Sequence, residues 1–188
     1  MTMFWRGKEP YARPRARSIL SNEKCMIEEL IRTVNELAYK SAKDGNGPFS
    51  ELFVKNGKIV STSFDLSVRK SSPTAHAELD LIRTYCAENK IFFLEGYTLV
   101  SSAEPCIMCS GAIHWSRISK VIFSVSQEKL KQAISGNKKP KCSELINFRK
   151  YKIKVVGPVL EDEDYQVFID FPMMSKIDRH KVFRNNYQ

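Results

Sequence analysis

Two short motifs in this sequence contain the residue types that bind and use a metal ion. His76 and Glu78 stand two positions apart, and Cys106 and Cys109 stand three positions apart. A catalytic zinc ion takes three protein ligands and keeps a fourth position for water, and one imidazole with two thiolates supplies that number. We therefore expect His76, Cys106 and Cys109 to hold one Zn2+ per subunit, and Glu78 to move protons without ligating the metal.

The spacing of the cysteines alone leaves other interpretations open, because Cys-x-x-Cys pairs also occur in redox sites and structural zinc sites. Pro105 favours the start of a helix, and two cysteines in its first turn would share one face, where the helix dipole favours thiolates. A structural zinc normally has four protein ligands, whereas three candidates occur here. The pattern His-x-Glu followed by Pro-Cys-x-x-Cys is the signature of zinc-dependent nucleobase deaminases.

The residues around both motifs resemble a known family. Segments 72–78 (SPTAHAE) and 104–117 (EPCIMCSGAIHWSR) are similar to the cytidine and deoxycytidylate deaminase superfamily, particularly its branch of guanine deaminases and tRNA adenosine deaminases. The similarity extends from about residue 23 to Phe171, and Trp115 resembles the guanine deaminase pattern more than the tRNA enzyme pattern. The resemblance implies hydrolysis of an amine on a free nucleobase or nucleoside, with release of ammonia and with guanine as the first substrate to test.

The same resemblance implies four substrate contacts. The backbone N–H of Ala77 matches a position that contacts the substrate, and Asp65 stands where relatives usually have an asparagine that reads the base edge. An ionised aspartate only accepts hydrogen bonds whereas asparagine also donates, so the preferred base is expected to present a different donor pattern. Phe49 and Trp115 are the other candidates, with core packing as the alternative for Phe49 and packing or an interface as the alternative for Trp115.

The elements that must position these residues follow from hydrophobic spacing and turn signals. Asn56-Gly57 between two strand-like runs is a strong hairpin signal, and a helical stripe starting at Ser21 or Asn22 predicts a first helix that ends at Asp44. Strands then alternate with helices, which predicts an α/β fold: a three-layer α/β/α sandwich around a five-stranded mixed sheet. The expected strands are 49–55, 58–64, 97–101, 120–125 and 153–156, and the expected later helices are 75–88, 105–115, 128–134 and 143–148, with helical structure after 156.

Length and composition predict one domain, which we place at residues 21–175, with a poorly ordered basic arm at 1–20 and a basic tail at 176–188. The resemblance implies that this domain is a deaminase domain. No apolar run approaches the roughly 18 residues of a membrane span, so we expect no membrane contact. The first residues have no apolar core of a secretion signal, and the five cysteines are consistent with free thiols. We therefore expect a cytoplasmic protein.

The formal charge of +9 is concentrated in two segments. Residues 1–22 contain five cations against one carboxylate, and residues 136–154 contain seven against one. Such segments are usually solvated surface, and otherwise they contact polyanions such as RNA. RNA is therefore a possible partner, besides a small base or nucleoside. By analogy with relatives we also expect a homodimer.

Two other functions remain open at this point. A tRNA adenosine deaminase would present a flipped adenosine to the same site and use the basic segments to hold phosphates. A catalytically silent relative would act as a binding partner, but the sequence contains all four chemical positions, including Glu78, which is not expected to be a ligand.

Overall fold

Helices and strands alternate along the described part of the chain. In this computed structural model the described residues are 16–133, 140–147 and 151–171. The predicted tail at 176–188 and residues 1–15 of the predicted arm lie outside these ranges. The elements are α1 (Ala16–Lys43), β1 (Ser50–Lys55), β2 (Lys58–Phe64), α2 (Ala77–Asn89), β3 (Thr98–Ala103), α3 (Ile107–Trp115), β4 (Lys120–Val125), α4 (Gln127–Ala133), α5 (Cys142–Ile146), β5 (Lys154–Val156), α6 (Glu161–Asp164) and α7 (Gln166–Asp170).

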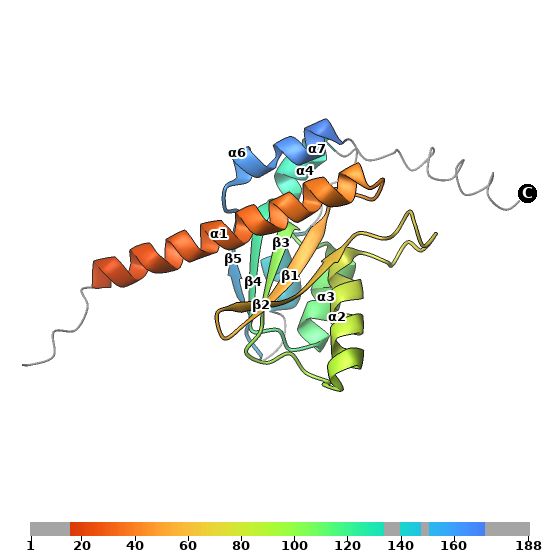
Figure 1. Cartoon of the computed structure of the whole chain (residues 1–188). Helices are drawn as coiled ribbons and strands as arrows, with labels where there is room; N and C mark the ends of the chain where they lie inside the picture. Colours follow the sequence, from red (N-terminus) through yellow and green to blue (C-terminus); the bar gives the residue numbers. More distant parts are fainter. Residues whose placement is uncertain (1–15, 134–139, 148–150, 172–188) are drawn as a thin grey trace, which may run out of the picture.

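The strands form one mixed sheet in the order β2-β1-β3-β4-β5 (Figure 1). Strand β1 pairs antiparallel with both β2 and β3, whereas β3, β4 and β5 are parallel to one another. The hairpin turn contains Asn56 and Gly57, whose φ angles of 51° and 73° are both positive, as a type I′ turn requires. The predicted five-stranded mixed sheet and its hairpin are confirmed.

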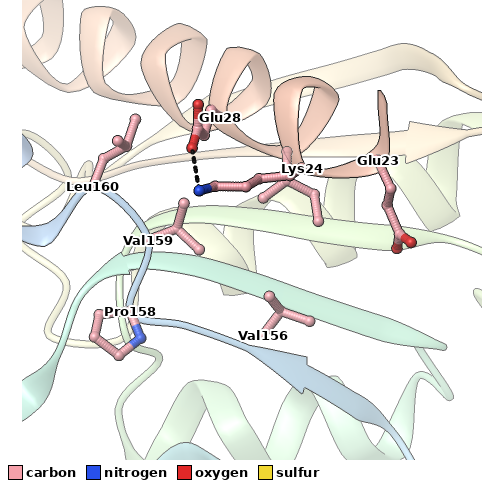
Figure 2. A pocket seen from close by; sticks show the side chains of 8 residues that line it. Glu23, Lys24, Glu28, Val156, Pro158, Val159 and Leu160 are labelled. Carbon is pink, nitrogen blue, oxygen red and sulfur yellow. Dashed lines mark ion pairs between the residues drawn. The ribbon is translucent and has the colours of Figure 1, made fainter. Parts of the chain in front are cut away.

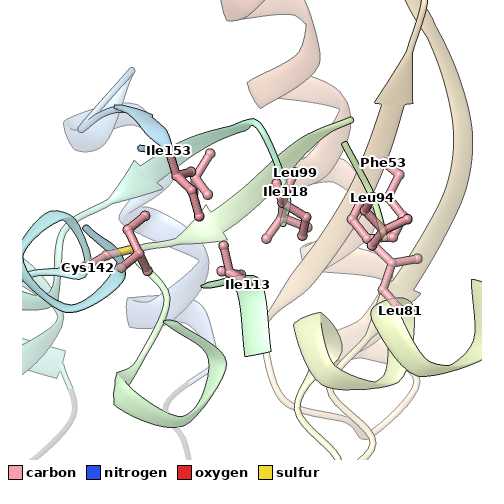
Figure 3. Packing of buried hydrophobic residues seen from close by; sticks show 10 residues of the cluster. Phe53, Leu81, Leu94, Leu99, Ile113, Ile118, Cys142 and Ile153 are labelled. Carbon is pink, nitrogen blue, oxygen red and sulfur yellow. The ribbon is translucent and has the colours of Figure 1, made fainter. Parts of the chain in front are cut away.

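Helices cover both faces of this sheet (Figure 1). Helix α1 packs across one face and α6 lies against β4 on the same side, while α2 and α3 cover the other face. Figure 3 shows part of the larger buried cluster, between the sheet and α2 and α3. This cluster includes Phe53, Leu81, Leu94, Leu99, Ile113 and Ile118, and the α1 face has its own cluster of Ile31, Val34, Leu52, Val100 and Ile122. The three-layer sandwich is confirmed.

The first helix is longer than the sequence pattern predicted. It begins at Ala16 instead of Ser21 or Asn22, so residues 16–20, which belong to the predicted arm, are helical. The physical reason is that the segment after Pro14 contains neither proline nor glycine until Gly45, and nothing in it interrupts a helix. Within the described ranges, none of the helices combines the length and apolar character that a membrane crossing requires.

Candidate active site

The N-termini of α2 and α3 bring the two sequence motifs together. His76 is the N-cap of α2 and Cys106 is the N-cap of α3, both with extended backbone angles. The first turns are closed by hydrogen bonds from the Asp80 N–H to the His76 carbonyl (3.0 Å) and from the Ser110 N–H to the Cys106 carbonyl (2.8 Å). Both positive helix ends therefore face one site, where they favour thiolates and other anions.

The sequence pattern predicted that Cys106 lies inside the helix, but in the structure it precedes the helix. The helix begins at Ile107, so only Cys109 stands in its first turn. The reason is the preceding Glu104, whose N–H bonds the Val125 carbonyl at 2.7 Å and whose carboxylate accepts backbone N–H groups from Gln127 (3.0 Å) and Cys142 (2.7 Å). These bonds hold the segment before the helix extended, and they fix the position from which the chain leads to Cys106 and Cys109.

The geometry of the three predicted ligands fits a zinc ion. Sγ of Cys106 lies 3.5 Å from Sγ of Cys109, and His76 Nδ1 lies 3.7 Å from the first sulfur and 3.6 Å from the second. Tetrahedral zinc with bonds of about 2.3 Å to sulfur and about 2.0 Å to nitrogen separates its ligand atoms by about 3.5–3.8 Å. The described residues contain no other such group of His, Cys, Asp and Glu side chains.

Within this cluster the electrostatics favour the thiolate of Cys106, whereas the contact with Cys106 raises the pKa of the Cys109 thiol. The hydrogen bond with Cys109, together with one from His76, lowers the pKa of the Cys106 thiol to about 4, against the opposing effect of burial. The same contact with Cys106 raises the pKa of His76. A thiolate is the form of cysteine that ligates zinc, so Cys106 is in the required state at neutral pH.

Glu78 is buried beside the cluster. Its side chain is 7% exposed, and it follows His76 by two residues in the first turn of α2. Burial, followed by the charge of Cys106, raises the pKa of Glu78 to about 7. A carboxyl group with this pKa can both accept and donate protons near neutral pH.

The structure places Asp65 and Ala77 close to the motif residues. Ala77 is fully buried as the first residue of α2, next to His76. Asp65 follows β2, is 5% exposed, and acts electrostatically on His76. Its Oδ1 accepts the Ser67 N–H at 2.7 Å, and its Oδ2 lies against Gly47, where an added Cβ would be 3.1 Å away. The contact of Asp65 and Ala77 with a base remains a prediction.

Phe49 and Trp115 lie in different surroundings. The ring of Phe49 packs against Phe168 of α7 with centroids 5.2 Å apart. Trp115 ends α3 and is 66% exposed. These positions agree with the packing alternative for Phe49 and the surface or interface alternative for Trp115. Contact of either side chain with a base remains a prediction.

Two buried acids near the site had not been singled out from the sequence. Glu104 fixes the segment that leads to Cys106, and Glu51 lies in β1 with 1% exposure. A signal for Glu51 was present, because its position in β1 has the same parity as Phe53 and therefore faces the same buried side. A charged residue at an inward strand position is unusual and indicates a special role.

A groove on the α1 side of the sheet is separate from this site. It lies between residues 23–28 of α1 and the end of β5 with the segment that follows it, and Figure 2 shows the Lys24–Glu28 ion pair (3.8 Å) on its wall. Its other lining residues include Ile27, Val156 and Leu160. None of the metal-binding candidates lines it, so the metal cluster and this groove are distinct features.

Fold and site together define an α/β protein with one histidine and two cysteines that could hold a metal ion. The model of the cytidine and deoxycytidylate deaminase zinc-binding region matches residues 25–125. A tRNA-specific adenosine deaminase of Buchnera aphidicola subsp. Baizongia pistaciae is 33% identical over 150 residues, which cover 80% of this chain and 90% of that protein. The guanine deaminase of Bacillus subtilis is 33% identical over 107 residues, which cover 56% of this chain and 69% of that protein.

A solved structure of a guanine deaminase from Nitrosomonas europaea has the same fold, with a TM-score of 0.69 and 22% identity over 77% of this chain and 84% of that one. The chain belongs to the cytidine and deoxycytidylate deaminase family and is a hydrolytic deaminase that acts on C–N bonds. The metal of the family model is zinc, and the His76, Cys106 and Cys109 group fits it.

Proposed function

We propose that this deaminase hydrolyses the amine of a free nucleobase or nucleoside, with guanine as the first candidate, and releases ammonia. The observation that carries the proposal is the cluster itself: three ligand atoms 3.5–3.7 Å apart, with the buried carboxyl group of Glu78 beside them. In this proposal His76, Cys106 and Cys109 are the metal ligands, and Glu78 is the catalytic residue.

Each residue has a defined part in the reaction. Zinc, when bound, supplies a Lewis acid that lowers the pKa of water to about 7. Glu78 takes a proton from the attacking water and returns protons to a ring nitrogen and to the leaving amine. Because Glu78 is buried, its protons pass to the substrate and not to bulk solvent.

The base is held by groups at the start of α2 and the end of β2. The Ala77 N–H donates to the ring, and Asp65 accepts from it. Oδ1 of Asp65 accepts the Ser67 N–H, and Oδ2, which lies beside Gly47, is the oxygen that we assign to the base. An acceptor at this position favours a ring edge that presents an N–H group, as the N1–H and 2-amino edge of guanine does.

The test is ammonia release by zinc-loaded protein with guanine, cytosine, adenine and their nucleosides as substrates. The matched control is Glu78→Gln, which keeps the size of the side chain but cannot carry the proton. We expect the control to retain zinc and to lose about 10²–10⁴-fold in kcat. Zinc-loaded protein that releases no ammonia from any base or nucleoside would contradict the proposal.

Deamination of adenosine in tRNA is a second candidate, supported by the named relatives that are tRNA-specific adenosine deaminases. The sequence of segment 136–154 contains seven cations that would contact phosphates in this case, of which residues 138, 139, 149 and 150 lie outside the described ranges. The test is inosine formation in tRNA at increasing salt. Activity on tRNA alone, falling steeply with salt, would favour this candidate over the first.

We also propose that the protein is a cytoplasmic homodimer that works in purine metabolism. Support for a dimer comes from large exposed apolar side chains on or near α3, namely Ile107, Trp115 and Phe92, because such groups commonly mark contact surfaces. All five cysteines are free thiols, which agrees with a reducing compartment. Light scattering after gel filtration tests the dimer, and a monomer at micromolar concentration would exclude it.

A further inference from the structure

Glu51 is a buried acid that neither the fold nor the proposed reaction explains. It lies in β1 opposite Ser101 of β3 and Ser63 of β2, and it is 1% exposed. Its Oε1 is 2.7 Å from the Ser101 hydroxyl, and its Oε2 is buried with no hydrogen-bond partner among the described residues. Burying a carboxyl oxygen without a hydrogen-bond partner is unfavourable, so the presence of Glu51 at this position indicates a specific role.

The contacts of Ser101 indicate that Glu51 carries a proton. The Ser101 hydroxyl hydrogen-bonds both Glu51 Oε1 and the Ala103 carbonyl oxygen. A serine hydroxyl has one hydrogen, and a carbonyl oxygen can only accept. If Glu51 were ionised, two acceptors would need the same hydrogen. A proton on Glu51 satisfies both contacts, because Glu51 then donates to Ser101 while Ser101 donates to Ala103.

The surroundings of Glu51 favour the same state. None of the ion pairs formed by the described residues includes Glu51. The charged groups that act on it are Glu78 and Cys106, and neither brings it a positive charge. Burial, followed by these two groups, raises the pKa of Glu51 well above its usual value, against the hydrogen bond from Ser101.

The strand and helix directions place Glu51 near the first turn of α2. Phe53, two residues further along β1, belongs to the same buried cluster as Leu81 of α2, and Figure 3 shows both. Phe53 also contacts Tyr85, one turn later, with ring centroids 5.5 Å apart. Glu78 acts electrostatically on Glu51, so β1 and α2 run away from the site in the same direction and Glu51 lies level with Glu78 as Phe53 does with Leu81.

We propose that Glu51 is a protonated carboxylic acid that positions the two metal-binding motifs relative to each other and thereby orients Glu78. Glu51 is close enough to Glu78 of the α2 motif for an electrostatic effect. Its hydrogen bond with Ser101 leads to Ala103, which precedes Glu104 and the segment with the two cysteines. Glu51 is a positioning residue in this scheme. Its effect on kcat rests on the proposed deaminase reaction, whereas its protonation and its effect on metal binding do not.

Two substitutions separate this role from simple packing. Glu51→Gln keeps the length, the neutral charge and a donor for Ser101, whereas Glu51→Met keeps the length but removes all hydrogen bonding. We expect Glu51→Gln to retain zinc affinity and kcat within about threefold. We expect Glu51→Met to bind zinc about tenfold more weakly and, at saturating zinc, to lose about tenfold or more in kcat with little change in KM.

A direct readout of the proton is infrared spectroscopy of the zinc-loaded protein at neutral pH. Wild type is expected to show a carboxylic-acid C=O band that Glu51→Gln removes, and this comparison does not need Glu51→Met to fold. Absence of that band, or equal losses in the Gln and Met variants, would overturn the proposal. Wild-type zinc affinity and activity in Glu51→Met would overturn it as well.

The two proposals fail in different ways. If the wild type deaminates no substrate, the proposed reaction fails, and the infrared band and the zinc affinities of the two variants still decide the role of Glu51. If the wild type is active but the band is missing, the reaction stands and the Glu51 proposal is overturned.

Discussion

On each face of the sheet a buried carboxyl group lies beside a serine. The pair on one face is close to the candidate active site, whereas the pair on the other face holds a segment of the chain in place. Glu51 contacts Ser101 on the α2 face, and Asp164 of α6 contacts Ser124 on the α1 face. Both keep one oxygen buried without a hydrogen-bond partner among the described residues. The local chemistry is therefore nearly the same at both positions.

The difference lies in what surrounds each pair. Glu51 is acted on by Glu78 and Cys106, which belong to the candidate active site. The serine beside Asp164 instead bonds the Val159 carbonyl at 2.9 Å, so that pair fastens the segment after β5 to β4. A buried acid therefore acquires its role from its neighbours, and substitutions on the two faces should differ in their effects.

The largest effect is expected from removing a metal ligand on the α2 face. Cys109→Ala should abolish stoichiometric zinc binding and activity, because two ligands do not complete the site. Cys86→Ala, on α2 but outside the cluster, is the matched control and should retain both. Zinc content by mass spectrometry and ammonia release check this, and full zinc content in Cys109→Ala would show that another residue completes the site.

Substituting the two serines compares the faces directly. Ser101→Ala and Ser124→Ala should each lower the free energy of unfolding by about 1–3 kcal/mol, because each leaves a buried carboxyl group without its partner. Only Ser101→Ala should also lower kcat at saturating zinc. Urea unfolding and steady-state kinetics measure the two quantities. Equal kcat values in both variants would mean that the faces do not differ in function.

The Asp164 pair should make stability depend on pH. Burial raises the pKa of Asp164 from 3.8 to about 6 in the folded protein, so the folded state holds this proton more tightly than the unfolded chain. The stabilisation is full below pH 3.8 and is lost as the pH rises through 6. Replacing Asp164 by Asn removes this loss, so between pH 5 and 7.5 the variant should gain about 1.4 kcal/mol relative to wild type.

Urea unfolding of both proteins at the two pH values measures this gain. A difference between variant and wild type that stays constant with pH would show that Asp164 does not titrate in this range. Asp170→Asn, which changes an exposed carboxylate of α7, is the matched control and should show a much smaller pH dependence.

The smallest effect is expected at the rim of the α2 face. Lys70 pairs with Asp80 at 2.5 Å, but Lys70 is about half exposed and Asp80 also pairs with Arg83. Lys70→Ala should therefore change the free energy of unfolding by no more than about 1 kcal/mol, and less at high salt. A loss above about 2 kcal/mol in thermal or urea unfolding would indicate that this pair holds the loop after β2 in place.

Local signals in the sequence were enough for the sheet and the metal cluster. The Asn56-Gly57 turn and the alternation of strands and helices depend on neighbouring residues, and the motif spacing specifies ligands at two helix starts. The start of α3 was misplaced because it depends on Glu104, whose partners Gln127 and Cys142 are 23 and 38 residues away. Contacts of this kind are not visible in local spacing.

The role of Glu51 depends on pairing between strands. Its partner Ser101 is 50 residues away, and the two meet only through the register of β1 with β3. The sequence pattern showed a charged residue at an inward position, but it did not show what that residue would face. The start of α1 is a simpler case, because the absence of a helix-breaking residue indicates where a helix can extend but not where it stops.

The meeting of two helix ends at the metal cluster also has a consequence for the order of folding. His76 and Cys106 are 30 residues apart, and β3 lies between them. Before β3 pairs with its neighbours, the chain offers one imidazole and, separately, a pair of thiols, neither of which is a complete site. High-affinity zinc binding therefore comes after the docking of α2 beside α3. The time course of metal uptake by refolding chains thus measures the rate of that docking step.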